Sequence, residues 1–166
     1  MSTEPLETKG TLGVSQNTAN ALMNSMWPQW KSLEKTLAFT NGTNENGDYN
    51  GTGNPSTLLT VTGTVEIAVI AVCTVAFLGT SATLELGTAL STAGIIALTT
   101  ATDITIGDIW HDNSPDSSVE ASTVIARKIV NQNVIFTVKT ADISAGTLKL
   151  FIFWNPISSD GNVVLA

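Results

Sequence analysis

The chain is poor in cysteine, histidine and charge. Its 166 residues include one cysteine and one histidine, which excludes an internal disulfide framework and a histidine-rich metal site. Charged residues make up 13% of the chain, about half of the usual share in globular proteins. Seven Lys and Arg stand against fourteen Asp and Glu, a formal charge of −7. Because nucleic-acid binding needs a basic surface, we expect no nucleic-acid partner.

The pattern of a leader or of a membrane helix is also missing. The first residues, MSTEPLE, are acidic where a signal peptide is basic, and no apolar segment follows them. The most hydrophobic stretch, residues 67–78, is shorter than the about 20 residues that a helix needs to span a bilayer. We therefore expect a protein made in the cytoplasm that has no membrane partner.

Threonine supplies much of the polarity. The chain contains 25 threonines, together with many serines, asparagines and glycines. Threonine is β-branched and fits a pleated, half-buried surface, so this composition favours an all-β protein.

Strand patterns are dense from residue 58 onward. Residues 65–77 alternate in the strand manner, and apolar side chains occupy both faces. This is typical of a strand covered on both sides, as in a sandwich interior or a subunit interface. Residues 91–102 fit either a strand or a short buried helix. Further strands are expected at 83–86, 119–130, 134–138 and 147–154. The short spacing predicts a β-sandwich or barrel over residues 58–166.

Residues 1–57 are expected to form an N-terminal arm. Trp30, Leu33 and Leu37 recur at helical spacing after a proline that suits a first helical turn, so a short amphipathic helix is predicted at about 28–39. The apolar face of this helix packs either on its own domain or on a neighbouring chain.

We favour the neighbouring chain because of the two segments that flank this helix. Met26 and Trp27 add more apolar surface than so short a helix needs for itself. The segment that follows, residues 41–54, is rich in Asn and Gly and has the composition of a flexible tether.

The richest polar segment is DIWHDNSPD, residues 108–116. It holds the residue types of a hydrolase, but a nucleophile and its base normally come from separate elements that converge. We therefore interpret it as a turn that Trp110 anchors, with carboxylates capping local N–H groups. His111 is expected at an interface, where its charge could change near pH 6.5. No catalytic residue, cofactor or metal ligand is assigned, and no enzymatic activity is expected.

Four segments resemble a recurrent pattern in small virion proteins of tailed bacteriophages. They are GDIWHDNSPD at 107–116, FIFWNPISSDGNVV at 151–164, and the strands that begin GTVEI at 63 and ATLELGT at 82. The resemblance covers roughly residues 60–166. It implies a non-enzymatic part of a virion, most like a capsid decoration (cement) protein. It also implies the major capsid protein or other virion proteins as partners, and it brings no catalytic residues.

From the residues and the resemblance together, we predict a homo-oligomer, with a trimer favoured, that stabilises the capsid lattice. The predicted interface residues are Met26, Trp27, Trp30, Leu33, Leu37, Trp110 and His111. A tail or head-fibre component is one alternative. A carbohydrate- or receptor-binding module that uses aromatics such as Trp110 is another. In a third alternative, the chain is an enzyme in which His111, with Asp108 or Asp112, acts on an ester or glycan.

Overall fold

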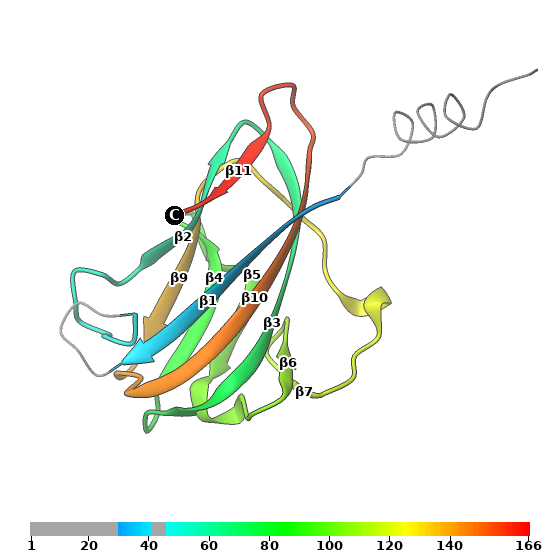
Figure 1. Ribbon diagram of the computed structural model, residues 1–166. Helices are drawn as coiled ribbons and strands as arrows, with labels where there is room; N and C mark the ends of the chain where they lie inside the picture. Colours follow the sequence, from blue (N-terminus) through cyan, green and yellow to red (C-terminus); the bar gives the residue numbers. More distant parts are fainter. Residues whose placement is uncertain (1–29, 41–45) are drawn as a thin grey trace, which may run out of the picture.

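The computed structural model describes residues 30–40 and 46–166 (Figure 1). These residues form two antiparallel sheets and two three-residue 3₁₀ turns, η1 at Ala101–Asp103 and η2 at Ser122–Val124. The all-β prediction is confirmed. Within the described part, no helix has the length and apolar content needed to cross a membrane.

The first sheet, here called sheet A, has the strand order β1-β10-β3-β6-β7, and β8 pairs with one end of β3. Figure 1 shows β1, β10 and β3 side by side across the front of the molecule. The strands of sheet A are β1 (Lys31–Thr40), β3 (Val65–Leu78), β6 (Asp108–Trp110), β7 (Asp116–Ser117), β8 (Lys128–Val130) and β10 (Ala145–Pro156).

The second sheet, sheet B, has the strand order β11-β2-β9-β4-β5. The 91–102 segment, for which strand and helix were both open, forms the edge strand β5. The strands of sheet B are β2 (Ser56–Thr62), β4 (Thr83–Thr88), β5 (Ser91–Thr100), β9 (Val134–Lys139) and β11 (Asn162–Leu165).

The strand pairs are nested along the chain. The innermost pair is β4 with β5, followed outward by β3 with β8, β2 with β9 and β1 with β10. Successive pairs lie alternately in sheet B and sheet A. These four pairs therefore form an antiparallel ribbon folded over on itself, and the further pairings β10–β3 and β9–β4 join its folds into two sheets.

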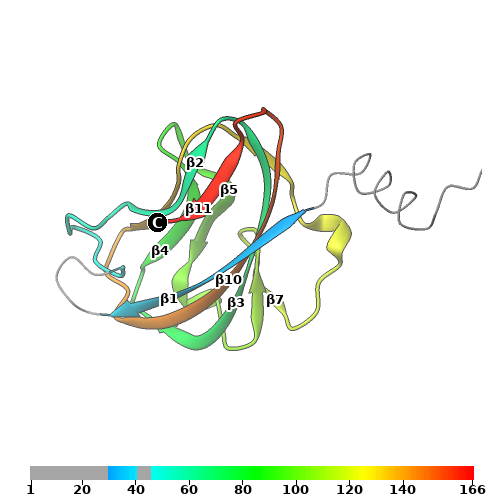
Figure 2. The same ribbon diagram turned by 45° about the horizontal axis from the view of Figure 1, so that its top comes forward.

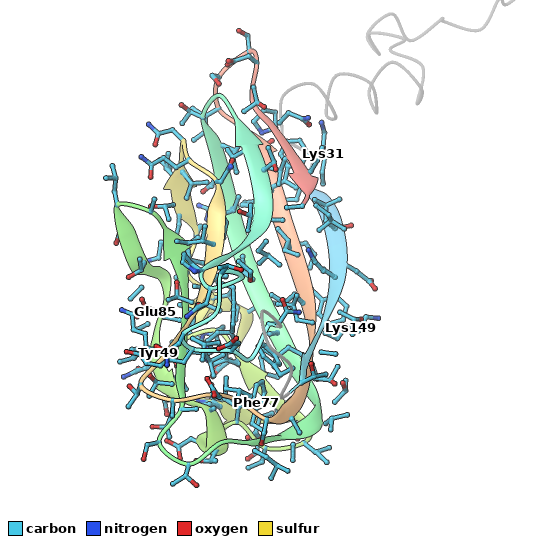
Figure 3. All side chains as sticks on the ribbon, turned by 90° about the vertical axis from the view of Figure 1, so that its left-hand side faces the viewer. Lys31, Tyr49, Phe77, Glu85 and Lys149 are labelled. Atoms are coloured by element: carbon cyan, nitrogen blue, oxygen red, sulfur yellow. The ribbon has the colours of Figure 1, made fainter. Side chains whose placement is uncertain are left out.

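One hydrophobic core is shared by the two sheets. Along β10, buried residues alternate strictly with half-exposed ones, as expected when one sheet face packs inward. The Phe39 ring of β1 lies 5.0 Å from the Phe77 ring of β3 and 5.3 Å from the Phe136 ring of β9, so it contacts both sheets (Phe77 is labelled in Figure 3). The buried β10 residues are Leu148, Leu150, Ile152 and Trp154.

Lys35 bridges one side of the molecule, between the edge strands β1 of sheet A and β11 of sheet B. Its ammonium donates to the carbonyl oxygen of Ala166, and the N–H of Ala166 donates to Leu58 of β2 at 3.1 Å. The edge of sheet A is thereby linked to the edge of sheet B.

The short helix predicted at about 28–39 is wrong for the described residues. Lys31–Thr40 is strand β1, paired with β10 at every position from Lys31↔Trp154 to Thr40↔Ala145. The spacing of Leu33 and Leu37 is compatible with both periods, because positions four apart share a face of a strand as well as of a helix. Phe39 is buried on the same strand face as Leu37. Pairing with β10 makes the segment a strand and not a helix.

The prediction of a strand at 119–130 is also wrong over most of that range. Only Lys128–Val130 pairs, as β8, and η2 and irregular backbone precede it. The free side of β3 is divided between β6, at Ala71↔Trp110, and β8, at Val65↔Val130. After β7, residues 118–127 therefore leave the sheet, and Figures 1 and 2 show this segment projecting from the side of the molecule.

The predicted tether is held against the domain where it is described. The Asn54 amide donates to the Val138 carbonyl at 2.7 Å, and its oxygen accepts from the Val138 N–H at 3.0 Å. The Ile143 N–H donates to Gly47 at 2.8 Å, and the Tyr49 N–H to Asp142 Oδ1 at 2.7 Å. Residues 41–45 lie outside the described part.

Replacing Leu37 by Ala tests the position of β1. Leu37 is 5% exposed, and removing such a side chain from a packed core costs about 2–4 kcal/mol of unfolding free energy. Its exposed neighbour Thr36 is the control, and Thr36→Ala should change the unfolding free energy by about 0.5 kcal/mol or less. Urea denaturation measures both, and equal small losses would place β1 outside the core.

Candidate functional site: an apolar groove beside a histidine–carboxylate cluster

The outer face of sheet A carries a groove of about 360 Å³. Strands β3 and β10 form its floor, the segment 118–127 forms one wall, and the residue preceding β1 forms its rim. Its lining is almost entirely apolar, which is unusual for the outward face of a sheet. The lining residues are Trp30, Ala68, Ile70, Ser122, Ile125, Arg127 and Phe153.

Cross-strand pairs build the groove floor. Ala68 lies opposite Phe153, and Ile70 lies opposite Phe151, so aromatic and aliphatic side chains alternate across the two strands. Here the odd-numbered residues of β3 and the even-numbered residues of β10 face the core. The side chains of these pairs belong to the other set on each strand, so they point outward. This apolar outer face is the second of the two apolar faces that the pattern of residues 65–77 indicated.

Arg127 connects the wall of the groove to its floor. Its guanidinium carbon lies 5.8 Å from the centre of the Trp30 ring, and its Nε lies 3.3 Å from Glu66 Oε1 on β3. Arg127 is itself largely exposed, so this ion pair stabilises the fold little and mainly orients the guanidinium over the indole.

A histidine–carboxylate cluster of three residues, His111, Asp116 and Glu120, lies at the start of the same wall. His111 is 5% exposed, and its Nε2 lies 3.2 Å from Asp116 Oδ2 and 3.5 Å from Glu120 Oε2. One ligand atom from each residue lies within 4.8 Å of the other two. A nearly buried imidazole therefore faces two partly exposed carboxylates.

The two carboxylates of the cluster titrate differently. The pKa of Asp116 is raised, mainly by its hydrogen bond with the Glu120 side chain and further by burial and by the charge of Glu120, while His111 acts to lower it. The pKa of Glu120 is lowered, first by the N–H of Ala121 and then by the hydrogen bond with Asp116. Asp116 is therefore the carboxyl that holds a proton more readily.

The neighbouring residues of the predicted turn fix the position of the imidazole. The Nε1–H of Trp110 donates to Thr99 Oγ1 at 2.9 Å, and the indole is completely buried. Asp108 accepts from the N–H and hydroxyl of Thr105, both at 2.8 Å. Asp112 accepts from the Ser114 N–H at 2.7 Å, which is the turn cap that the sequence predicted.

The predicted interface residues are dispersed by the structure. Met26 and Trp27 lie outside the described residues. Trp30 lines the groove, and Leu33 is half-buried against the core. The side chains of the other three are covered by their own chain, because β1 and β6 direct the first two inward and the third, which follows β6, faces Asp116 and Glu120. These residues are Leu37, Trp110 and His111.

The residues named for the enzyme alternative have different partners, and the tryptophan named for sugar binding is covered. Asp108 and Asp112 serve local turns, whereas His111 faces Asp116 and Glu120. Trp110 is covered, so its ring offers no stacking surface for a sugar.

Sequence reasoning missed Glu120 and the groove-floor residues. Nothing in the sequence shows that Glu120 returns to His111, nine residues earlier, because the return depends on an irregular segment. The outward Ile70 was visible in the two-sided pattern of 65–77, and Phe153 in the alternation of 147–154. Their meeting depends on the register of β3 with β10.

Comparisons with protein families, with curated proteins and with solved structures give no match.

A double-mutant cycle tests the Trp110 anchor. Thr99→Val leaves the buried indole N–H without an acceptor, which should cost about 1–3 kcal/mol of unfolding free energy. Trp110→Phe removes the donor together with part of the ring. The double variant should lose less than the two single losses added together, because the unsatisfied donor is gone. Urea denaturation of all four proteins measures the coupling, and strictly additive losses would contradict this hydrogen bond.

Proposed function

We propose that this chain is a non-enzymatic structural protein of a bacteriophage virion, a decoration protein that binds the lattice of the major capsid protein and stabilises it. The apolar groove on the outer face of sheet A carries the proposal. In the groove, the floor residues Ile70 and Phe153 and the rim residue Trp30 are half-buried in the chain alone, so a partner can cover them further.

The groove has the chemistry of a protein contact. Interface cores are depleted in charge and enriched in aromatic residues and Arg, and the groove offers Trp30, Phe153 and Arg127. Most of the polar surface is uncharged, because only 13% of the chain is charged. We therefore assign the groove to contact with a neighbouring copy of this chain, in a trimer that sits on the lattice.

The strand order supports this proposal at the level of the fold. We propose that the two sheets form a β-sandwich of the jelly-roll kind, which is a folded antiparallel ribbon of eight strands. The nested pairs β1–β10, β2–β9 and β4–β5 are those such a ribbon requires, with β3 paired to both β6 and β8. Jelly rolls are frequent in viral capsid proteins, although lectins share them, so the fold alone does not decide the function.

Repetition would supply the stabilising effect. Each copy makes a modest contact, but copies linked into a trimer engage a symmetric lattice at several points. The overall avidity of the trimer then exceeds the affinity of one contact. No catalytic step is needed.

The test is to place a charge in the groove and measure assembly. Ile70→Asp should reduce the trimer fraction and the copies retained on phage particles that lack the protein by at least about tenfold, because an unpaired charge desolvated at a contact costs more than about 1.4 kcal/mol. Light scattering gives the solution mass, and co-sedimentation gives the particle occupancy.

Leu98→Asp is the matched control. Leu98 is an exposed leucine of β5 in sheet B, so the same kind of charge enters away from the groove. Circular dichroism confirms that both variants fold. A parent chain that stays monomeric and does not sediment with particles, or equal binding by both variants, would overturn the proposal.

A further inference from the structure

The histidine–carboxylate cluster has the donor set of a metal site. His111 offers one imidazole nitrogen, and Asp116 and Glu120 each offer a carboxylate oxygen. Zinc in proteins is bound by these donors, commonly by three protein ligands with water in the fourth position. The side chain of His111 is 3% exposed and directs Nε2 at both carboxylates, so the nitrogen ligand is already oriented.

The distances within the cluster fit a single small cation. Around a tetrahedral zinc ion with bonds of about 2.0–2.2 Å, neighbouring ligand atoms are separated by about 3.3–3.5 Å. The Nε2 of His111 lies 3.2 Å from Asp116 Oδ2 and 3.5 Å from Glu120 Oε2. Little movement of His111 relative to either carboxylate would therefore be needed to admit the ion.

Charge favours a cation at this place. Asp116 and Glu120 each bring a carboxylate oxygen within 4.8 Å of the other, and two ionised carboxylates this close repel. Among the cations of the described residues, none forms an ion pair with either carboxylate apart from His111. A divalent ion would neutralise both carboxylates together.

The segment that carries Glu120 has few other attachments. Its backbone hydrogen bonds outside regular elements are local, from Val119 to Ser117 at 2.7 Å and from Val124 to Ala121 at 3.1 Å. Ser118 adopts φ 57°, a left-handed conformation that is uncommon for serine. The contact of Glu120 with His111 is therefore one of the few links between this segment and the sheet.

We propose that His111, Asp116 and Glu120 bind a divalent transition-metal ion, Zn²⁺ fitting best, and that the ion fastens segment 118–127 to β6 and β7. The same segment supplies Ser122, Ile125 and Arg127 to the groove. Metal binding thereby orders the groove wall. This inference stands independently of the virion function, because it concerns binding and local order in the isolated chain.

The direct test is a Zn²⁺ titration of the full chain without a histidine tag, after chelator treatment. Calorimetry should give one Zn²⁺ per chain. Glu120→Gln should weaken the affinity at least about tenfold. Loss of a group that only supports a metal ligand weakens metal affinity about 10–100-fold, and loss of a ligand itself should weaken it at least as much. Asp103→Asn, which changes an exposed carboxylate on η1, should leave the affinity unchanged. Titrations with Mn²⁺, Ca²⁺ and Mg²⁺ should show weaker binding.

Trypsin supplies a second readout, because Arg127 and Lys128 border the segment. Zn²⁺ should slow cleavage after Arg127 at least about tenfold in the parent chain and should not do so in Glu120→Gln. Circular dichroism confirms the fold of each variant. If Glu120→Gln does not fold, His111→Gln serves in its place. The proposal is overturned if the parent binds no stoichiometric Zn²⁺, if the variant binds it equally well, or if Ca²⁺ or Mg²⁺ binds more tightly.

Discussion

The structure depends on the pairing of β10 with β1 on one side and β3 on the other. Side chains alternate along a strand, so this register decides which residues enter the core and which face outward. Leu148, Leu150 and Ile152 are completely buried, while Phe151 and Phe153 are left on the opposite face. A shift by one residue would exchange the two sets. The core and the groove are therefore two results of one register.

Local patterns predicted much of the fold and little of the site. The alternation in 65–77, 134–138 and 147–154 identified three strands, because a half-buried strand shows its period in the sequence. It failed for β1, where the spacing of Leu33 and Leu37 suits two periods and the partner strand lies more than a hundred residues away. It failed again at 119–127, because the β-branched residues there find no strand to pair with.

The two parts of the site share one irregular segment. Residues 118–127 contribute Glu120 at one end and Ile125 and Arg127 at the other. Such segments carry function in many folds because a rigid sheet can support them without fixing their sequence. A sequence shows which residues a segment contains, but not which distant side chain it returns to. This is why His111 was found without its partner Glu120.

The two edges joined by Lys35 limit how copies of this chain can associate. An edge strand offers unpaired N–H and C=O groups to any extended segment, and charged side chains discourage such pairing. Edge strand β1 carries Lys31, Glu34 and Lys35 (Lys31 is labelled in Figure 3), and the Lys35 ammonium is bonded to the chain end beside β11. Strand addition at β1 and at β11 is thus disfavoured. A contact on a sheet face, unlike strand addition, can stop at a closed number of copies.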